Sequence, residues 1–542
     1  MEIQTIDASL LSKMFLSGAK SLESKKEWIN ELNVFPVPDG DTGTNMTMTI
    51  MSAAKAVSEL KDPDMKTLTK AMSSGSLRGA RGNSGVILSQ LLRGFAKVAG
   101  NYDELTVEIL NEAFEKATQT AYKAVMQPKE GTILTVARAA ADKAAEIALK
   151  TDDIQVFADA VITAAEETLA KTPDMLPVLK QAGVVDSGGQ GLVQFLKGGQ
   201  DILLGKEVDL TIGEPVEEKE EETVEEQAAP AEDVKFDYCT GLTVKSSAKL
   251  LSYQIKEFKA YLESAGDLLD FTNDDNKMTV HVHTLEPGNV ITKAMAYGQL
   301  SDVKVLNNSE NACNKSASNA EPEKEMGFVS IATGEGLSSI FIELGCDYMI
   351  PGGQTMNPST DDILSAVEHV NAKTVFVLPN NKNIILAANQ AASICKDKKL
   401  VVIPTKTIPQ GITALISFSA DASVEDNTNA MTEEIANVKT GQVTYAVRDT
   451  MIDDKEIKMN DWMGMGDSGL LSVNADIDTA FLEMIDAMVS EDSSVVSIYW
   501  GEGSDENKAT ALGEKIAEKY PDLEIEISCG GQAVYAYIVS VE

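Results

Sequence analysis

The sequence predicts a multidomain protein with an all-α N-terminal domain, a small α/β middle domain and an α/β C-terminal domain. Apolar residues recur at helical spacing through residues 6–203, a strongly acidic run follows at residues 214–233, and short apolar strands alternate with helical stretches from about residue 326. A chain of 542 residues is also too long for one ordinary hydrophobic core. The parts we expect are a helical domain at residues 1–205, a linker at 206–233, a middle domain at 234–312 and a C-terminal domain at 325–542.

The first 200 residues have the periodicity of packed helices. Leu88, Leu91, Leu92 and Phe95 would line one face of a helix. Residues 136–145 read VARAAADKAA, and alanine-rich stretches of this kind have high helix propensity and allow close helix packing. Because strand-like alternation is scarce, we expect this region to be all-α.

The acidic run separates this region from the rest of the chain. Residues 214–233 hold ten acidic residues and one lysine. A segment of this composition cannot bury enough apolar surface to offset the entropy lost on ordering it. We therefore expect a linker, and an acidic interaction tail is the alternative.

The chain beyond the linker is expected to be α/β. In the middle domain, residues 279–283 alternate like a strand and residues 247–264 have a helical pattern. The strands expected farther on are at residues 327–332, 374–380 and 399–404. Strands separated by helical stretches favour a parallel sheet, and ligands or partners of such sheets sit at the carboxyl ends of strands, where loops such as residues 352–360 would lie. Nothing in this region indicates a long apolar pocket.

Composition excludes several classes of function. The formal net charge is −38 and the pI is near 4.4, whereas binding to a nucleic-acid backbone needs a basic footprint, so we expect no nucleic-acid partner. No run of about 18 apolar residues occurs, which argues against a transmembrane helix. The first residues, MEIQT, lack the basic start of a signal peptide, and the five cysteines are scattered. We expect a cytoplasmic protein without a disulfide framework.

The most informative motif is residues 36–46, which read PVPDGDTGTNM. Asp39 and Asp41 lie two residues apart beside glycines, just before a helical pattern. Hard oxygen ligands suit Mg²⁺, which commonly binds through one or two carboxylates together with substrate phosphates. A plain turn is the alternative, because Asp-Gly pairs are ordinary turn formers. A calcium loop is excluded, since its twelfth position requires a bidentate Glu and falls on Ile50 here.

Three further small-residue turns precede helical patterns. They lie at residues 73–85, 129–132 and 186–191. Helix N-termini expose N–H groups that bind anions. One such turn is an ordinary cap, but several of them together with a paired-Asp turn indicate loops gathered around a nucleotide. The residues alone therefore favour an Mg²⁺–ATP-dependent phosphotransferase.

A second candidate site lies in the middle domain. His281 and His283 are two of only three histidines in the chain, and strand geometry puts both on one face. With Cys239 they would supply two imidazoles and a thiolate, a zinc set with an open fourth position. The alternative is that Cys239 is a small buried residue and the histidines are an exposed pair. The other cysteines and His369 are isolated in the sequence.

These motifs resemble those of a known family. Residues 1 to about 203 resemble the ATP-binding L subunit of dihydroxyacetone kinases, an all-helical barrel, whose Gly-Asp-Gly-Asp turn corresponds to residues 38–41 here. The run at residues 33–46, together with YCT at 238–240 and HVHT at 281–284, resembles the ATP-binding subunit of bacterial fatty acid kinase, over essentially the whole chain. The C-terminal region is similar in fold to the DegV-type fatty-acid-binding proteins that partner that kinase.

The sequence departs from the family pattern in two places. Dihydroxyacetone kinases carry a third Asp upstream of the pair, and the nearest polar residue here is Asn33, one residue farther away. Residues 307–311 read NNSEN, where the fatty acid kinase family more often has Met and His. Asn33 thus takes the place of a carboxylate, and no role is assigned to residues 307–311.

The resemblance implies an ATP-dependent kinase that phosphorylates a fatty acid and releases an acyl phosphate for phospholipid synthesis. A separate, fatty-acid-loaded DegV-type protein would present the substrate to the C-terminal domain, and the kinase would be a homodimer. The implied Mg²⁺ ligands are Asn33, Asp39 and Asp41, the implied zinc ligands are Cys239, His281 and His283, and the implied nucleotide contacts are Thr42, Gly43, Thr44, Asn45, Ser84, Gly85, Thr132 and Asp186. Asp39, Asp41 and the zinc ligands are also the implied catalytic residues.

The chemistry this kinase needs is charge neutralisation, because a carboxylate is already ionised at pH 7 and requires no general base. Arg78, Arg81 or Lys129 would assist Mg²⁺. Three roles of the middle-domain site stay open. Zinc could be structural, zinc could polarise the acyl carboxylate, or a histidine could carry phosphate. A kinase of a small ketone such as dihydroxyacetone and a non-catalytic nucleotide-sensing adaptor are the alternatives.

Overall fold

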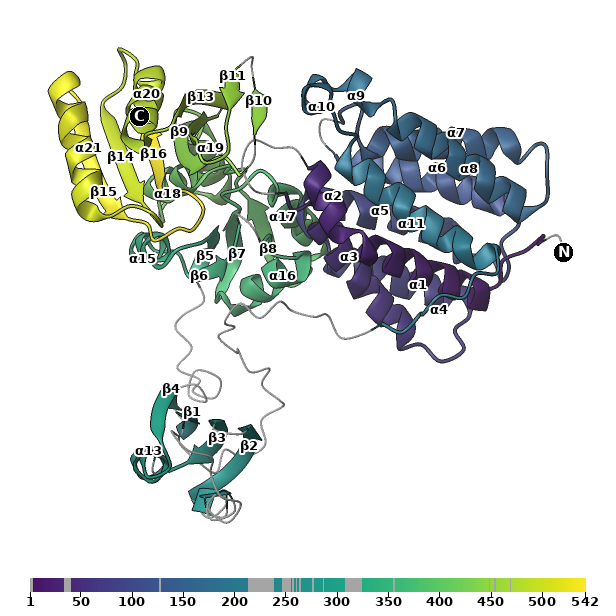
Figure 1. Cartoon of the computed structure of the whole chain (residues 1–542), viewed down its shortest axis with the longest axis horizontal. Helices are drawn as coiled ribbons and strands as arrows, with labels where there is room; N and C mark the ends of the chain where they lie inside the picture. The colour runs from purple at the N-terminus through teal and green to yellow at the C-terminus, as the bar shows by residue number, and fades with distance from the viewer. Residues whose placement is uncertain are drawn as a thin grey trace. The chain divides into compact units, whose positions relative to one another are not determined.

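The protein is described from a computed structural model (Figure 1). Outside the middle domain it describes residues 3–33, 40–125, 128–212, 324–353, 356–447, 449–452, 455–467 and 469–542. In the middle domain it describes residues 238–245, 255, 258–259, 261–262, 265–274, 277–285 and 287–307. The chain forms two compact units, residues 1–216 with 323–542 and residues 217–322. Most of the expected linker, most of the helix expected at residues 247–264 and residues 308–311 lie outside the described residues.

The first part of the larger unit is helical, as expected (Figure 1). Its helices are α1 (Ala8–Ser24), α2 (Lys26–Leu32), α3 (Thr42–Ser58), α4 (Met65–Arg78), α5 (Gly82–Ala99), α6 (Val107–Ala124), α7 (Ile133–Ile147), α8 (Ile154–Leu169), α9 (Thr172–Met175), α10 (Pro177–Ala182) and α11 (Ser187–Leu203). Asp7, Asp64, Thr106, Asp153 and Asp186 each cap the helix that follows, because their side chains accept a hydrogen bond from a first-turn N–H group.

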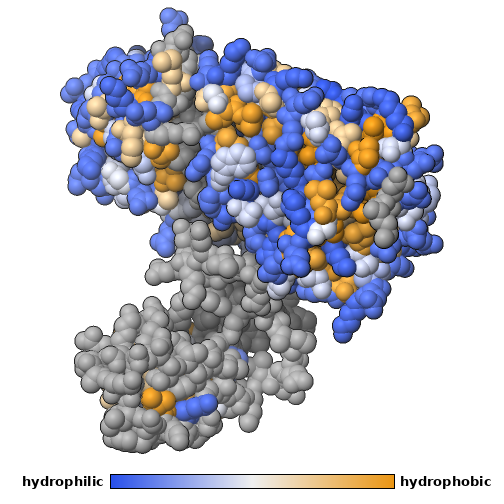
Figure 2. All heavy atoms as spheres, turned by 45° about the vertical axis from the view of Figure 1, so that its right-hand side comes forward, coloured by the Kyte–Doolittle hydropathy of each residue, from blue (hydrophilic) through white to orange (hydrophobic). Residues whose placement is uncertain are grey.

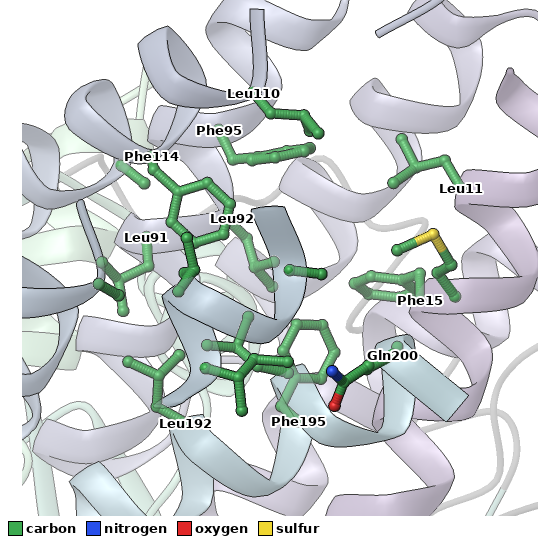
Figure 3. Close-up of a pocket in the computed structure, with 18 of the residues that line it drawn as sticks. Leu11, Phe15, Leu91, Leu92, Phe95, Leu110, Phe114, Leu192, Phe195 and Gln200 are labelled. Carbon is green, nitrogen blue, oxygen red and sulfur yellow. The ribbon is translucent and has the colours of Figure 1, made fainter. Parts of the chain in front are cut away.

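These helices pack around one apolar core. Phe95, Phe114 and Phe157 contact one another edge to face, with centroids 6.4 and 6.2 Å apart. A cavity of about 170 Å³ lies in this core, and Figure 3 shows that its lining is almost wholly aliphatic and aromatic, with Gln200 the one polar side chain labelled. A charged phosphate would be costly to bury against such a lining, so a nucleotide site must lie elsewhere.

The smaller unit contains a four-stranded antiparallel sheet of order β2-β3-β1-β4. Its elements are β1 (Tyr238–Lys245), β2 (Gly266–Asp274), β3 (Lys277–Thr284), α13 (Pro287–Met295) and β4 (Gln299–Asn307). Leu242 and Val244 of β1 and Val280 and Val282 of β3 share an apolar core with Val290 of α13. The even-numbered positions of β1 and β3 therefore belong to the helix-covered face, and the odd-numbered positions belong to the other. The strand expected at residues 279–283 is confirmed as part of β3.

The second part of the larger unit begins with a parallel sheet of order β6-β5-β7-β8. Its strands are β5 (Lys324–Ala332), β6 (Tyr348–Pro351), β7 (Ala372–Leu378) and β8 (Lys399–Val402), and its helices are α15 (Glu335–Glu343), α16 (Thr360–His369) and α17 (Ile385–Ile394). The strands expected at residues 327–332, 374–380 and 399–404 correspond to β5, β7 and β8. Their parallel pairing is confirmed.

A second, mixed sheet of order β13-β12-β9-β16-β14-β15 completes this unit. The elements after β8 are α18 (Ile408–Ile416), α19 (Val424–Glu434), β9 (Lys439–Tyr445), β10 (Thr450–Ile452), β11 (Lys455–Ile457), β12 (Trp462–Gly466), β13 (Gly469–Asn474), α20 (Ile477–Met488), β14 (Val495–Trp500), α21 (Glu506–Lys519), β15 (Glu524–Cys529) and β16 (Tyr537–Val541). All of its pairs except β14–β15 are antiparallel. We did not predict this sheet from the sequence. Local periodicity does not reveal which distant strands pair, and β9 pairs with β16, the last strand of the chain.

Most of the described residues on the face shown in Figure 2 are hydrophilic. On the face shown in Figure 2, hydrophobic residues occur in small patches that hydrophilic residues separate. Within the described part of the chain, none of the helices has both the length and the apolar character needed to cross a membrane.

Candidate nucleotide-binding site

Asp41 occupies an unusual position at the start of α3. It is the N-cap residue of that helix, the place where an Asp side chain ordinarily accepts a first-turn N–H bond. The Asp41 carboxylate makes no such bond to α3, although the residue is only 9% exposed. The Asp41 carboxylate therefore lies at the positive end of the α3 dipole without capping this helix, an environment that favours negative charge.

The cap of α3 is supplied by Asn30 of α2 instead. Its Oδ1 accepts from the Thr44 backbone N–H at 3.0 Å, and its Nδ2 donates to Thr44 Oγ1 at 2.9 Å. Gly43 permits this contact, because a Cβ at that position would lie 2.1 Å from the Lys26 carbonyl oxygen. The packing of α2 on α3 thus replaces Asp41 as the cap.

The start of α5 lies against the start of α3. A Cβ at Gly85 would meet Thr49 Oγ1 at 2.2 Å and the Asn45 carbonyl oxygen at 3.1 Å, so only glycine allows this approach. The Arg81 backbone N–H donates to Thr49 Oγ1 at 3.2 Å. The structure therefore brings the predicted nucleotide contacts Asn45 and Gly85 together near Asp41, with Ser84 beside them in the first turn of α5.

Asp186 joins the first turns of α7 and α11. Its carboxylate accepts from the Gly189 N–H at 2.7 Å and also from the Ile133 N–H. Burial raises the pKa of this carboxyl from its ordinary 3.8 to about 6, although the two N–H groups act in the opposite direction. Thr132 is the N-cap residue of α7, and its hydroxyl donates to the Lys129 carbonyl at 2.8 Å. Asp186 and Thr132 are thus neighbours, and Asp186 acts as a cap for α11.

The α7–α11 pair adjoins the α3–α5 pair. Gly191 of α11 lies against Met46 of α3 and Leu22 of α1. The first two turns of α3, α5, α7 and α11 are therefore neighbours. The turn predicted at residues 73–85 is wrong over residues 73–78, which form the end of α4, and only residues 79–81 connect α4 to α5. The stretches at 129–132 and 186–191 lead into α7 and α11. Backbone N–H groups at adjoining helix starts create a region that favours anions.

The structure says less about the roles of the other predicted site residues. Asn33 is the C-cap residue of α2, and its carbonyl oxygen lies near Gly40. Asp39 lies outside the described residues. Arg78 pairs with Asp361 at 3.2 Å, and Lys129 is exposed. The ligand roles predicted for these residues therefore stay predictions.

The C-terminal part of the larger unit packs directly against this region. Ala80 and Val86 belong to the same apolar core as α16 and α17. Gln90 Nε2 donates to Gln390 Oε1 at 2.7 Å, and Gln390 Nε2 donates to the Leu77 carbonyl at 2.7 Å. Both glutamine side chains are buried.

Asn357 connects this interface to the site. This residue lies in the loop before α16 and is 1% exposed. Its Nδ2 donates to Asp41 Oδ2 at 2.6 Å. Its carbonyl oxygen accepts from Arg81 Nη1 at 3.0 Å, and Arg81 Nη2 pairs with Asp362 at 3.3 Å. Arg81, which we expected to assist Mg²⁺, binds α16 and its preceding loop in this structure.

The second candidate site is described by its backbone. Cys239 of β1 is the register partner of His283 on β3, and Gly241 is the partner of His281. Positions 239, 281 and 283 therefore share the face of the sheet that does not carry the apolar core. The side chains of Cys239 and His281 lie outside the described part of the structure, so their ligand role stays a prediction.

Comparison with known proteins places these features in a family. Residues 36–201 match the DAK2 domain, residues 235–314 match the middle domain of FakA-like fatty acid kinase proteins, and residues 327–542 match their C-terminal domain. Protein YloV of Bacillus subtilis is 42% identical over 554 residues, which cover the whole of both chains. The chain belongs to the FakA-like family of fatty acid kinase proteins. An uncharacterized protein of Staphylococcus aureus is 41% identical, again over the full length of both chains.

Solved structures resemble parts of this FakA-like protein. DegV, a fatty acid binding protein from Bacillus subtilis, has a TM-score of 0.30 and 13% identity and covers 40% of this chain and 99% of its own. The dihydroxyacetone kinase from C. freundii in complex with AMP-PNP and Mg²⁺ has a TM-score of 0.29 and 19% identity, covering 36% of this chain and 34% of its own. Scores this low carry no argument about the site.

Two residues of the site were missed from the sequence. Asn30 has no motif, and nothing in a single helical pattern reveals that it caps another helix. Asn357 lies in the loop at residues 352–360 that we singled out as a place for ligands or partners, but its contact with Asp41 spans 316 residues of sequence. The sequence signal for Asn357 was therefore its position in this loop, whereas no sequence signal pointed to Asn30.

Asn30→Ala should weaken nucleotide binding by more than the loss of folding stability explains. Loss of a helix cap costs about 1 kcal/mol, and the α3 N-terminus would then recruit Asp41 as its cap. We expect weaker Mg²⁺-dependent binding of an ATP analogue, measured by calorimetry on the full chain. Asp64→Ala is the matched control, because it removes the cap of α4. Equal nucleotide affinities in the two variants would contradict this role of Asn30.

Asp186 should make stability fall as pH rises. Between pH 4 and pH 6 the folded chain keeps its Asp186 proton, while the unfolded chain, with the ordinary pKa near 3.8, has lost it. The free energy of unfolding therefore decreases with pH in this window, by roughly 3 kcal/mol for a pKa near 6. Asp186→Asn should remove that decrease, measured by urea denaturation at a series of pH values. An unchanged pH slope in the variant would show that Asp186 is not the titrating group.

Proposed function

We propose that this protein transfers the γ-phosphate of ATP to the carboxylate of a fatty acid that a separate fatty-acid-binding protein presents. The family membership supports a kinase. The observation that carries the proposal is the buried Asp41 carboxylate, which lies at the start of α3 but does not cap it. A chain that needed only a turn at this place would let Asp41 cap its own helix and would not require Asn30.

The donor set at this site suits Mg²⁺. Asp41 offers a buried carboxylate oxygen beside the N-terminus of α3. Mg²⁺ prefers such hard oxygen ligands. Asp41 would hold the ion with Asp39 and Asn33, and the bound ion would neutralise charge on the transferred phosphoryl group.

The first turns of the helices would bind the phosphates. The nucleotide contacts we propose are Thr42, Gly43, Thr44, Asn45, Ser84, Gly85, Thr132 and Asp186. Backbone N–H groups in these turns favour anions, and Gly85 lets the starts of α3 and α5 approach each other. Asp186 contributes by holding the first turns of α7 and α11 together.

The transfer itself requires no proton removal. A fatty acid carboxylate is ionised at neutral pH, so one of its oxygens can form the bond to the γ-phosphorus directly. The bond from that phosphorus to the bridging oxygen breaks, and ADP leaves with the electron pair. The protein's task is to align the two oxygens and to exclude water, which agrees with a site built from backbone N–H groups and carboxylates.

The middle domain is proposed to bind zinc through Cys239, His281 and His283. Register places the first and the last of these opposite each other, and His281 lies two positions along the same strand. Two imidazoles and a thiolate are a common zinc set, and an open fourth position would let the metal polarise an acyl carboxylate.

The C-terminal part of the chain is proposed as the docking surface for the fatty-acid-binding partner. We infer a DegV-like fold for it, a helical barrel for the N-terminal part and a homodimeric assembly from the motif resemblance.

Asp41→Asn should lower fatty-acid-dependent ATP turnover by roughly 100-fold or more, since it removes a charge at the phosphoryl site. The assay combines the full chain, Mg²⁺-ATP and a fatty-acid-loaded binding protein, with hydroxylamine to trap acyl phosphate as a hydroxamate. Asp64→Asn serves as a control for an Asp that only caps a helix. Turnover with dihydroxyacetone in place of the fatty acid would favour a small-ketone kinase, and no turnover with nucleotide binding intact would favour the adaptor.

His281→Ala should lose bound zinc. We expect about one zinc ion per wild-type chain by elemental analysis, and little in His281→Ala, because two remaining ligands hold the metal poorly. His369→Ala is the matched control, since this histidine ends α16 in the other unit. A wild-type protein without zinc would refute the site, whereas zinc loss with unchanged turnover would make it structural.

A further inference from the structure

The amide of Asn357 has a defined orientation in the site. The Asp41 carboxylate oxygen can only accept a hydrogen bond, so the Asn357 atom 2.6 Å away must be the donating Nδ2. The Oδ1 atom therefore points away from that oxygen. The assignment of the two amide ends follows from chemistry, because two acceptors at this distance would repel each other.

The Oδ1 atom of Asn357 is buried and has no hydrogen-bond partner. The whole residue is 1% exposed. Buried polar atoms almost always have a partner, and a buried acceptor without one is costly. An acceptor in this state directly beside a carboxylate is suited to a donor that arrives with a ligand.

The loop that carries Asn357 is held by contacts to both parts of the larger unit. Arg81 binds the Asn357 carbonyl, and the Thr360 N–H donates to the Ala80 carbonyl at 3.1 Å. Ser359 and Asp362 form a capping box at the start of α16. The loop that carries Asn357 is therefore held next to the start of α5 by the Arg81 side chain and the Ala80 carbonyl.

We propose that Asn357 is a positioning residue of the Mg²⁺–ATP site. Its Nδ2 holds the Asp41 carboxylate in place, and its Oδ1 accepts a hydrogen bond from a water molecule bound to the divalent cation. The inference rests on the proposed function, and it adds that the C-terminal region completes the nucleotide site. Mg²⁺-dependent nucleotide binding then requires the contact between the two parts of the unit.

Three full-length variants test this role. Asn357→Leu removes both polar ends at similar volume. Asn357→Asp places a second carboxylate against Asp41. Asn383→Ala is the matched control, because Asn383 accepts from Asn83 at 3.1 Å across the same interface but does not contact Asp41. Each protein is titrated with Mg²⁺ in the presence of a non-hydrolysable ATP analogue, and its melting temperature is measured with and without Mg²⁺.

For Asn357→Leu we expect the Mg²⁺ concentration at half-maximal binding to rise roughly tenfold or more, as for other residues that orient a metal ligand. Nucleotide binding without Mg²⁺ should be unchanged. Asn357→Asp should melt at a lower temperature than wild type without Mg²⁺, because two adjacent carboxylates repel, and should recover when Mg²⁺ is added. Asn383→Ala should keep the wild-type Mg²⁺ dependence.

Other outcomes overturn the proposal. If Asn357→Leu and Asn357→Asp both have the Mg²⁺ dependence of wild type, Asn357 is not part of the site, although the kinase proposal stands. A loss of melting temperature in Asn357→Asp that Mg²⁺ does not restore would assign Asn357 to packing alone. If wild type itself binds the nucleotide without any effect of Mg²⁺, the proposed metal site falls and this inference falls with it.

Discussion

The two hydrogen bonds between Asn30 and Thr44 are the interaction on which the proposed site depends. A helix begins with unpaired N–H groups, and a neighbouring Asp would normally accept from one of them. Because Asn30 reaches across from α2 to satisfy the Thr44 N–H, the Asp41 carboxylate is released from capping while remaining at the positive end of α3. The paired-Asp motif alone therefore does not create the proposed metal site. It needs the packing of α2 on α3, with Gly43 at the point of closest approach.

The polar interface between the two parts of the larger unit also positions a residue of the proposed site. Gln90 and Gln390 are buried, and their amides bind each other and the Leu77 carbonyl. Buried polar groups tolerate few alternative arrangements, because each misplaced donor or acceptor loses its partner. Such a network favours one relative placement of α5 and α17, and this placement brings Asn357 against Asp41. The proposed nucleotide site and the proposed docking region are thus joined by specific contacts.

Local patterns predicted much of the fold. The helices of residues 8–203 and the strands β3, β5, β7 and β8 follow from hydrophobic periodicity, which depends on neighbours a few residues apart. The second sheet of the C-terminal part did not, because its central strands come from distant segments. In the site, the starts of α5, α7 and α11 were visible in the sequence as small-residue stretches. The roles of Asn30 and Asn357 were not, since each is an ordinary polar residue until the surface it faces is known.

The sequence by itself determined the helical and α/β regions and the family, since these features are written in short motifs and local spacing. The roles of the Asp39–Asp41 pair and of the Cys–His set stay predictions. Only the tertiary structure decided which side chain caps α3, that Arg81 binds α16 and its preceding loop, and that Asn357 contacts Asp41. The physical reason is that a hydrogen-bonding group takes whichever partner packing places within reach. That choice depends on contacts across hundreds of residues, such as the 316 between Asp41 and Asn357.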